Sequence, residues 1–213
     1  TLEARDVIVM CPDIETFAPL VHATFGAGEG LDLDGDGGGE RAPELGVRLA
    51  DRSLRQTNPV LNATSALLAL ADARVTSAEV VDFAGRDPVR RRFRLDDDDL
   101  ARLGEWVSSA GIRWGLDADH RKPFDLAGVA QNTWRAGLDR LLVGVAMADE
   151  GQRVVGGVVP LDDAESGAID LAGRFAELVE RLHEAIADLR RPKTVEAWAR
   201  SIAAAAGALM DTT

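Results

Sequence analysis

The sequence predicts a mainly α-helical chain that opens with a small α/β element. After residue 58, apolar residues recur at helical spacing, most clearly at Leu171, Phe175, Leu178, Leu182, Ala185 and Leu189. Before that point, two short apolar runs are typical of buried strands. Hydrophobic residues make up 46% of the 213, enough for a sizeable core. We therefore expect two domains, at residues 1–57 and 58–213.

The first element is a strand that leads into a helix. The apolar run Val7–Met10 is stopped by a Pro-Asp pair, which favours a strand, a turn and then a helix from Ile14 to Phe25. Pro19 fits this helix only in its first turn, because proline lacks a backbone N–H. Thr16 is therefore the expected N-cap.

A loop and a second strand follow before the helical part begins. Residues 26–44 are rich in Gly, Asp and Glu and show no periodicity, which predicts a loop. Val47–Ala50 predicts a short strand. Asn58 followed by Pro59 is the pattern of an N-cap and a first helical residue. The residues of this helix expected to face inward are Val60, Thr64, Leu67 and Leu68.

The next helices have clear start signals. Ser77 is the expected cap of a helix at 78–84, and an Asp-Pro pair opens a short basic helix at residue 87. The acidic run Asp96–Asp99 precedes a helix at 100–110, where carboxylates favour the positive end of the helix dipole.

Three longer segments complete the helical part. Asn132 or Thr133 caps a helix to about Met147, with one apolar side formed by Trp134, Leu138, Leu141, Leu142 and Val145. The stripe from Leu171 to Leu189 is too short for a coiled coil, so we expect a helix packed inside a helical domain. Thr194 caps a final Ala-rich helix through about Met210.

Composition excludes several classes of protein. The net charge of −12 argues against a simple nucleic-acid binder, which usually carries a basic face. The arginines between Arg86 and Arg94 predict a solvated face or a contact with a partner subunit. A single cysteine, Cys11, excludes an internal disulfide framework and a Cys-based zinc site. The apolar runs are too short to cross a bilayer, and no signal peptide is expected, so we expect cytoplasmic residence.

No catalytic or cofactor motif is complete. The acidic run at 32–36 has Pro43 where an EF-hand requires Glu. His183 begins a metalloprotease-like pattern, but Ala187 stands in place of the second histidine. A phosphate-binding Gly-Lys-Ser/Thr loop is absent. We therefore predict no catalytic residue, metal or cofactor in this chain.

Six segments of the chain occur in the order of a known family. They are the strand–turn–helix at 7–25, the strand and Asp-Arg pair at 47–52, the Pro-Val-Leu helix start at 59–61, Gly111–Asp117, Thr133–Leu142 and Val159–Asp162. Together they resemble the RecC family, the gamma chain of the bacterial RecBCD helicase–nuclease (exodeoxyribonuclease V). Gly35–Gly39 is a Gly/Asp expansion of a short family loop, and we interpret it as a surface insertion.

The resemblance implies a fold and a role. Residues 1–57 would open the second RecA-like domain, of an inactive superfamily 1 helicase type, and 58–213 would be its inserted helical domain. The segment would be a non-catalytic scaffold and DNA-channel element of exodeoxyribonuclease V, in double-strand break repair by homologous recombination. RecB-like and RecD-like partners would use ATP and Mg²⁺. The alternatives are a stand-alone acidic helical protein-interaction module and a fragment of an AddB-like subunit.

Five residues are candidates for contact with DNA in the full complex: Arg52, Arg55, Gln56, Arg113 and Trp114. Arginine binds phosphate, and tryptophan offers a face on which an unpaired base can stack. The structural alternative is that Arg52 pairs with a nearby carboxylate and that Trp114 fills the core between helices. Because the chain is acidic, we expect any DNA binding to be weak and salt-sensitive.

Overall fold

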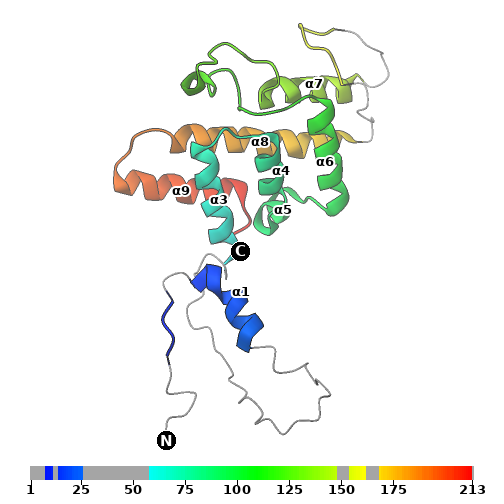
Figure 1. Ribbon diagram of the computed structural model, residues 1–213. Coiled ribbons are helices and arrows are strands. Elements are labelled where there is room, and N and C mark those ends of the chain that lie inside the picture. The colour runs from blue at the N-terminus through cyan, green and yellow to red at the C-terminus, as the bar shows by residue number, and fades with distance from the viewer. Residues whose placement is uncertain (1–7, 12–13, 26–57, 148–153, 162–167, 213) are drawn as a thin grey trace, which may run out of the picture. The chain divides into compact units, whose positions relative to one another are not determined.

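The computed structural model describes residues 8–11, 14–25, 58–147, 154–161 and 168–212 (Figure 1). The chain divides into two compact units, Thr1–Thr57 and Asn58–Thr213, and each is considered by itself. None of the helices described is long and apolar enough to cross a membrane. The predicted loop at 26–44 and the predicted strand Val47–Ala50 lie outside the described residues.

The described part of the first unit consists of residues 8–11 and a helix, α1 (Ile14–Phe25), which has the predicted bounds. Pro19 lies inside this helix, beyond its first turn, so the expectation that Thr16 caps it was wrong. The predicted strand at 7–10 was also wrong for residues 8–10, which are the part of it that the structure describes. Ile8, Val9 and Met10 are more than four-fifths exposed and belong to no strand. A strand exists only through its partners, and the described residues supply none to this run.

The second unit is helical, as predicted. Its α-helices within the described ranges are α3 (Pro59–Asp72), α4 (Ser77–Ala84), α5 (Asp87–Phe93), α6 (Asp97–Ser109), α7 (Trp134–Ala146), α8 (Ile169–Leu189) and α9 (Val195–Leu209). A 3₁₀ turn, Lys122–Phe124, lies between α6 and α7. Extended pairing in these ranges is limited to two isolated bridges, Thr76 with Trp114 and Val155 with Val158.

Local capping explains where most of these helices begin. The Asn58 side chain accepts hydrogen bonds from the N–H groups of the first turn of α3, as predicted. At α4 the cap is Thr76, one residue before the predicted Ser77. Thr76 accepts from the backbone of Glu79, whose carboxylate accepts the Thr76 N–H at 2.7 Å. This reciprocal pair requires a carboxylate three residues after the cap, and Ser77 has Val80 there.

Helix α8 lies at the centre of the core. It packs against α3, α5, α7 and α9, and Figure 1 shows it between α7 and α9. Every residue of the predicted stripe from Leu171 to Leu189 is buried. Trp134 on α7 is fully buried and meets Phe175 of α8 edge to face, with ring centroids 6.1 Å apart. Its indole N–H donates to the Val75 carbonyl at 3.0 Å, which ties α7 to the turn before α4.

Two residues predicted to face inward are partly exposed. Leu68 of α3 is 36% exposed and Leu142 of α7 is 39% exposed. Both lie at the margin of an apolar face whose centre is buried, at Leu67 and Leu141. A helical apolar stripe is wider than the contact it makes with one neighbour, so its margins reach solvent.

Candidate nucleic-acid interface

Arg113 and Trp114 lie in the segment that joins α6 to α7. The Arg113 N–H donates to the Asn132 carbonyl at 3.0 Å, and the Arg113 carbonyl accepts from Ser77 at 2.9 Å. Trp114 forms the bridge with Thr76. These bonds hold the segment against both α4 and the start of α7. Arg113 is exposed and Trp114 is half-buried, so both are accessible on the surface.

Arg121 fixes the loop around Trp114 from the inside. Its buried guanidinium donates to the carbonyls of Trp114 at 2.6 Å, Val129 at 3.0 Å and Gln131 at 2.8 Å. It lies 4.4 Å from the centroid of the Trp114 ring, which adds a cation–π contact. Burial lowers the pKa of Arg121 from its usual range. Three carbonyl acceptors and an aromatic ring therefore take the place of solvent around this charge.

Gly115 makes this arrangement possible. Its φ of +78° lies in the left-handed region, and its N–H donates to the Arg74 carbonyl at 3.0 Å. A Cβ at this position would lie 2.8 Å from the Nε of Arg121. Glycine therefore provides both the turn and the space for the guanidinium.

The ring of Trp114 belongs to a small cluster of aromatic and cationic side chains. Phe124 meets it edge to face, with centroids 5.4 Å apart, and Arg74 lies 5.6 Å from the Trp114 centroid and 5.4 Å from that of Phe124. The α8-centred core does not include Trp114. We call Arg74, Trp114, Arg121 and Phe124, together with the adjacent residue Arg113, the Trp114 cluster. The structure thus contradicts the expectation that Trp114 fills the core between helices.

Exposed cations lie both in this cluster and in the arginine-rich stretch. Arg74 and Arg113 are exposed, and neither forms an ion pair within the described ranges. In the stretch from residue 86 to 94, Arg86 pairs with Asp82 at 2.9 Å and Arg90 with Asp97 at 2.7 Å. Arg91, Arg92 and Arg94 of this stretch are exposed and form no ion pair with a described residue, so both regions offer cations to an outside ligand.

The structure brings together only part of the predicted set. Arg113 and Trp114 lie side by side, whereas Arg52, Arg55 and Gln56 lie outside the described residues. Sequence reasoning missed Arg74, Arg121 and Phe124. Their spacing from Trp114 follows no period, because a loop and a 3₁₀ turn bring them to it. No motif in the sequence marks these three residues.

The titratable groups among the described residues of the second unit form no catalytic arrangement. His120 is buried and its ring nitrogens have no hydrogen-bond partner. Burial, with a smaller effect from Arg190, lowers the pKa of His120 to about 4, so the ring is neutral at physiological pH. His183 approaches Asp117 at 3.4 Å. Within the part of the chain that the structure describes, no group of three or more His, Cys, Asp or Glu could hold a metal ion.

A family model and the sequences of known relatives point to the same protein family. The family model for the RecBCD enzyme subunit RecC fourth domain matches residues 57–213. Three RecBCD enzyme subunit RecC sequences are among the relatives. That of Mycobacterium tuberculosis strain H37Rv is 46% identical over 203 residues, covering 95% of this chain and 18% of the relative. That of Mycolicibacterium smegmatis is 45% identical over 213 residues, covering 98% and 20%. That of Escherichia coli K12 is 34% identical over 201 residues, covering 93% and 17%.

These matches cover nearly the whole chain but only a part of each relative. The chain spans about one fifth of the length of these curated relatives. The family model nevertheless covers the whole helical unit, and the relatives align with nearly the whole chain. The chain therefore belongs to the RecC family, and its residues 57–213 match the fourth domain of that subunit.

Proposed function

We propose that this chain is a non-catalytic scaffold and DNA-channel element of a RecC-type subunit. It works with RecB-like and RecD-like subunits on DNA ends, in the repair of double-strand breaks, and those partners use ATP and Mg²⁺. The observation that carries this proposal is the match of the helical unit to the RecC fourth domain. That match favours it over a stand-alone interaction module and over an AddB-like fragment. Residues 1–57 would open a RecA-like domain.

The packing of the helical unit suits a scaffold. A single buried cluster runs from Ala63 on α3 to Met210 after α9, so the helices share one core. Arg174 of α8 adds polar ties across it, with ion pairs to Asp99 at 3.1 Å and Asp170 at 2.8 Å. Close-packed interiors deform little, so such a unit holds its surface loops in fixed positions.

We infer that the Trp114 cluster contacts a single strand of DNA. Arg74 and Arg113 are free to bind phosphate, and the exposed part of the Trp114 indole offers a surface for a base. Two phosphate contacts on single-stranded DNA give a slope of about −1.4 in log K against log salt. Arg52, Arg55 and Gln56 remain proposed contacts of the first unit.

The DNA contact is tested by fluorescence anisotropy with a labelled oligothymidine at several salt concentrations. We expect weak binding that fades as salt rises. Arg113→Ala should lower the magnitude of the slope by about 0.7, and Trp114→Ala should cost about 1–3 kcal/mol of binding free energy. The matched control is Arg102→Ala, because Arg102 is an exposed arginine on α6 that forms no ion pair with a described residue. Equal losses for Arg102→Ala and Arg113→Ala would leave only a general charge effect.

The scaffold role is tested by a graft. This chain replaces the matching segment of the Mycolicibacterium smegmatis RecC, and the partner subunits are then co-purified with the grafted subunit. We expect the three-subunit assembly to form. We also expect the isolated chain neither to hydrolyse ATP with DNA present nor to degrade linear duplex with Mg²⁺. Turnover that follows the chain through purification would refute the non-catalytic role.

A further inference from the structure

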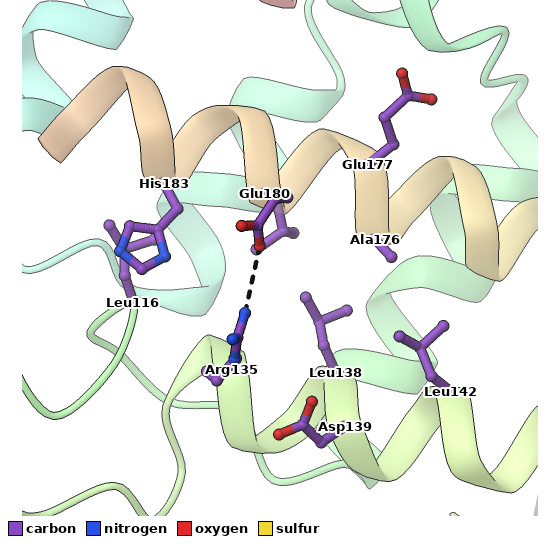
Figure 2. A pocket seen from close by; sticks show the side chains of 10 residues that line it. Leu116, Arg135, Leu138, Asp139, Leu142, Ala176, Glu177, Glu180 and His183 are labelled. Carbon is purple, nitrogen blue, oxygen red and sulfur yellow. Dashed lines mark hydrogen bonds and ion pairs between the residues drawn. The ribbon is translucent and has the colours of Figure 1, made fainter. Parts of the chain in front are cut away.

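A groove between α7 and α8 is not used by the proposed DNA contact. Its floor is apolar and includes Leu116, Leu138 and Val179, which are nearly fully buried. Leu142 extends the floor toward solvent, and Figure 2 shows Leu138 and Leu142 pointing from α7 toward α8. The groove holds about 290 Å³. Small-molecule sites usually enclose about 300–1,000 Å³, so this groove is at the lower end of that range and is large enough for one or two side chains of a partner.

The polar groups that line the groove are mostly acidic. Asp139 comes from α7, and Glu177 and Glu180 come from α8, and they face the Arg135 guanidinium and the His183 imidazole. Glu180 faces Arg135 across the groove at 3.4 Å, and both side chains are more than half exposed (Figure 2). Such an exposed, long ion pair holds its partners weakly and exchanges readily. The groove therefore carries a net negative charge at its rim.

One of these carboxylates is available to an outside ligand. Glu177 pairs within its own helix with Arg181 at 2.5 Å, and Glu180 pairs with Arg135. Asp139 is exposed and makes no hydrogen bond or ion pair with any other described residue. Its charge repels phosphate, so the groove does not suit nucleic acid. The groove instead suits a cationic side chain whose apolar stem can pack against the apolar floor.

We propose that this groove docks a segment of a partner protein that presents an arginine beside a leucine-sized apolar side chain. The apolar side chain packs against Leu138 and Leu142, and the guanidinium binds Asp139. Arginine fits better than lysine because its planar fork binds a carboxylate through two hydrogen bonds and its stem covers apolar surface. Arginine is also enriched among residues that dominate binding energy at interfaces. This proposal rests on the proposed function only in one respect, which is that the segment is assigned to another subunit of the same complex.

The probe is a pair of end-blocked helical peptides that differ at one position. One carries leucine and arginine four residues apart, and the other has glutamate in place of arginine. Binding is followed by amide chemical shifts of the isotope-labelled 213-residue chain. We expect the arginine peptide to shift residues of α7 and α8 that line the groove, and the glutamate peptide to leave them unchanged. Loss of a charge-assisted contact should weaken binding roughly tenfold or more in Asp139→Lys.

Glu105→Lys is the matched control. Glu105 is an exposed carboxylate on α6, it does not line the groove, and its replacement changes the net charge by the same amount. The control should bind the arginine peptide as the wild type does. An equal loss in both variants, or no shift in the groove with the arginine peptide, would overturn the proposal. A dimer that Asp139→Lys abolishes would also overturn it, by naming a second copy of the chain as the occupant.

The grafted subunit separates this proposal from the proposed function. If the graft assembles and Asp139→Lys reduces assembly while Glu105→Lys does not, both proposals are supported. If the graft assembles equally with either substitution, the groove does not dock a subunit and the scaffold role stands. If the unsubstituted graft fails to assemble while the peptide still binds, the scaffold role fails and the recognition chemistry stands.

Discussion

Gly137 on α7 is the position where a single methyl group should most clearly disturb the loop that carries Arg113 and Trp114. A Cβ at Gly137 would lie 2.6 Å from Cδ1 of Ile112 and closer still to its Cγ1. Ile112 is 1% exposed and β-branched, so its side chain is closely packed and its χ1 is restricted. Gly137→Ala must therefore move the segment that leads directly to Arg113.

The expected change in the free energy of unfolding of Gly137→Ala is the balance of two opposing effects. Alanine gains about 1 kcal/mol over glycine in a helix interior. Forcing a methyl group into a filled core costs typically about 1–3 kcal/mol, and more where the contact is very short. We expect Gly137→Ala to lower the free energy of unfolding by about 1–2 kcal/mol, because this contact falls at the costly end. Gly173→Ala on α8 is the matched control, since no atom lies within 4 Å of its Cβ. It should raise stability by up to about 1 kcal/mol.

The assay is urea unfolding of both variants, followed by tryptophan fluorescence and circular dichroism. Ile112→Ala provides a second check, because it removes the atoms that clash. The double variant Gly137→Ala/Ile112→Ala should lose less stability than the sum of the two single variants. Strict additivity, or a Gly137→Ala variant as stable as Gly173→Ala, would refute the reasoning about this contact.

Three further predictions concern the stability of the helical unit. The pKa of His120 falls from 6.5 to about 4 on folding, so the unfolded state binds more protons between these values; stability should drop by about 2 kcal/mol from neutral pH to pH 5 in urea melts, and His120→Gln should lack this dependence. Arg174→Met leaves Asp99 and two carbonyls without their donor and should cost about 2–3 kcal/mol, whereas Arg102→Met should stay within about 0.5 kcal/mol. Thr194→Ala removes the N-cap of α9 and should cost about 1 kcal/mol in a thermal melt, while Thr194→Asp should keep the cap.

The helices could be predicted because the signals that form them are local. The stripe from Leu171 to Leu189 repeats at the helical period, and its residues are all buried in α8. Asn58, Thr133 and Thr194 cap their helices through bonds to residues only two or three positions away. The Ser77 prediction failed by one residue because the reciprocal bond with Glu79 selects Thr76.

Two predictions in the first unit were wrong for different reasons. The run at 7–10 has the composition of a strand, but its hydrogen bonds would need neighbours that the described residues do not provide. Pro19 was expected in the first turn and lies deeper in α1. Proline disfavours a helix interior without excluding it, so its position alone does not set the start of a helix.

The candidate site was predictable by residue type and not by arrangement. Arg113 and Trp114 stood out because arginine and tryptophan suit nucleic acid. Arg121 could not be identified in this way, since a buried guanidinium held by three carbonyls follows from the path of the loop. The groove at Asp139 likewise depends on how α7 crosses α8.

The proposed role of this chain is that of a structural segment of a RecC-type subunit in DNA-end processing. Its most direct test is ATP-dependent unwinding of a blunt duplex by the assembled complex that carries the graft in the Mycolicibacterium smegmatis RecC. We expect unwinding close to that of the parent complex, because the helical unit brings its own core and, in the proposed function, the motors lie on the partner subunits. A complex that assembles with a folded graft but neither unwinds the duplex nor binds its end would contradict the account.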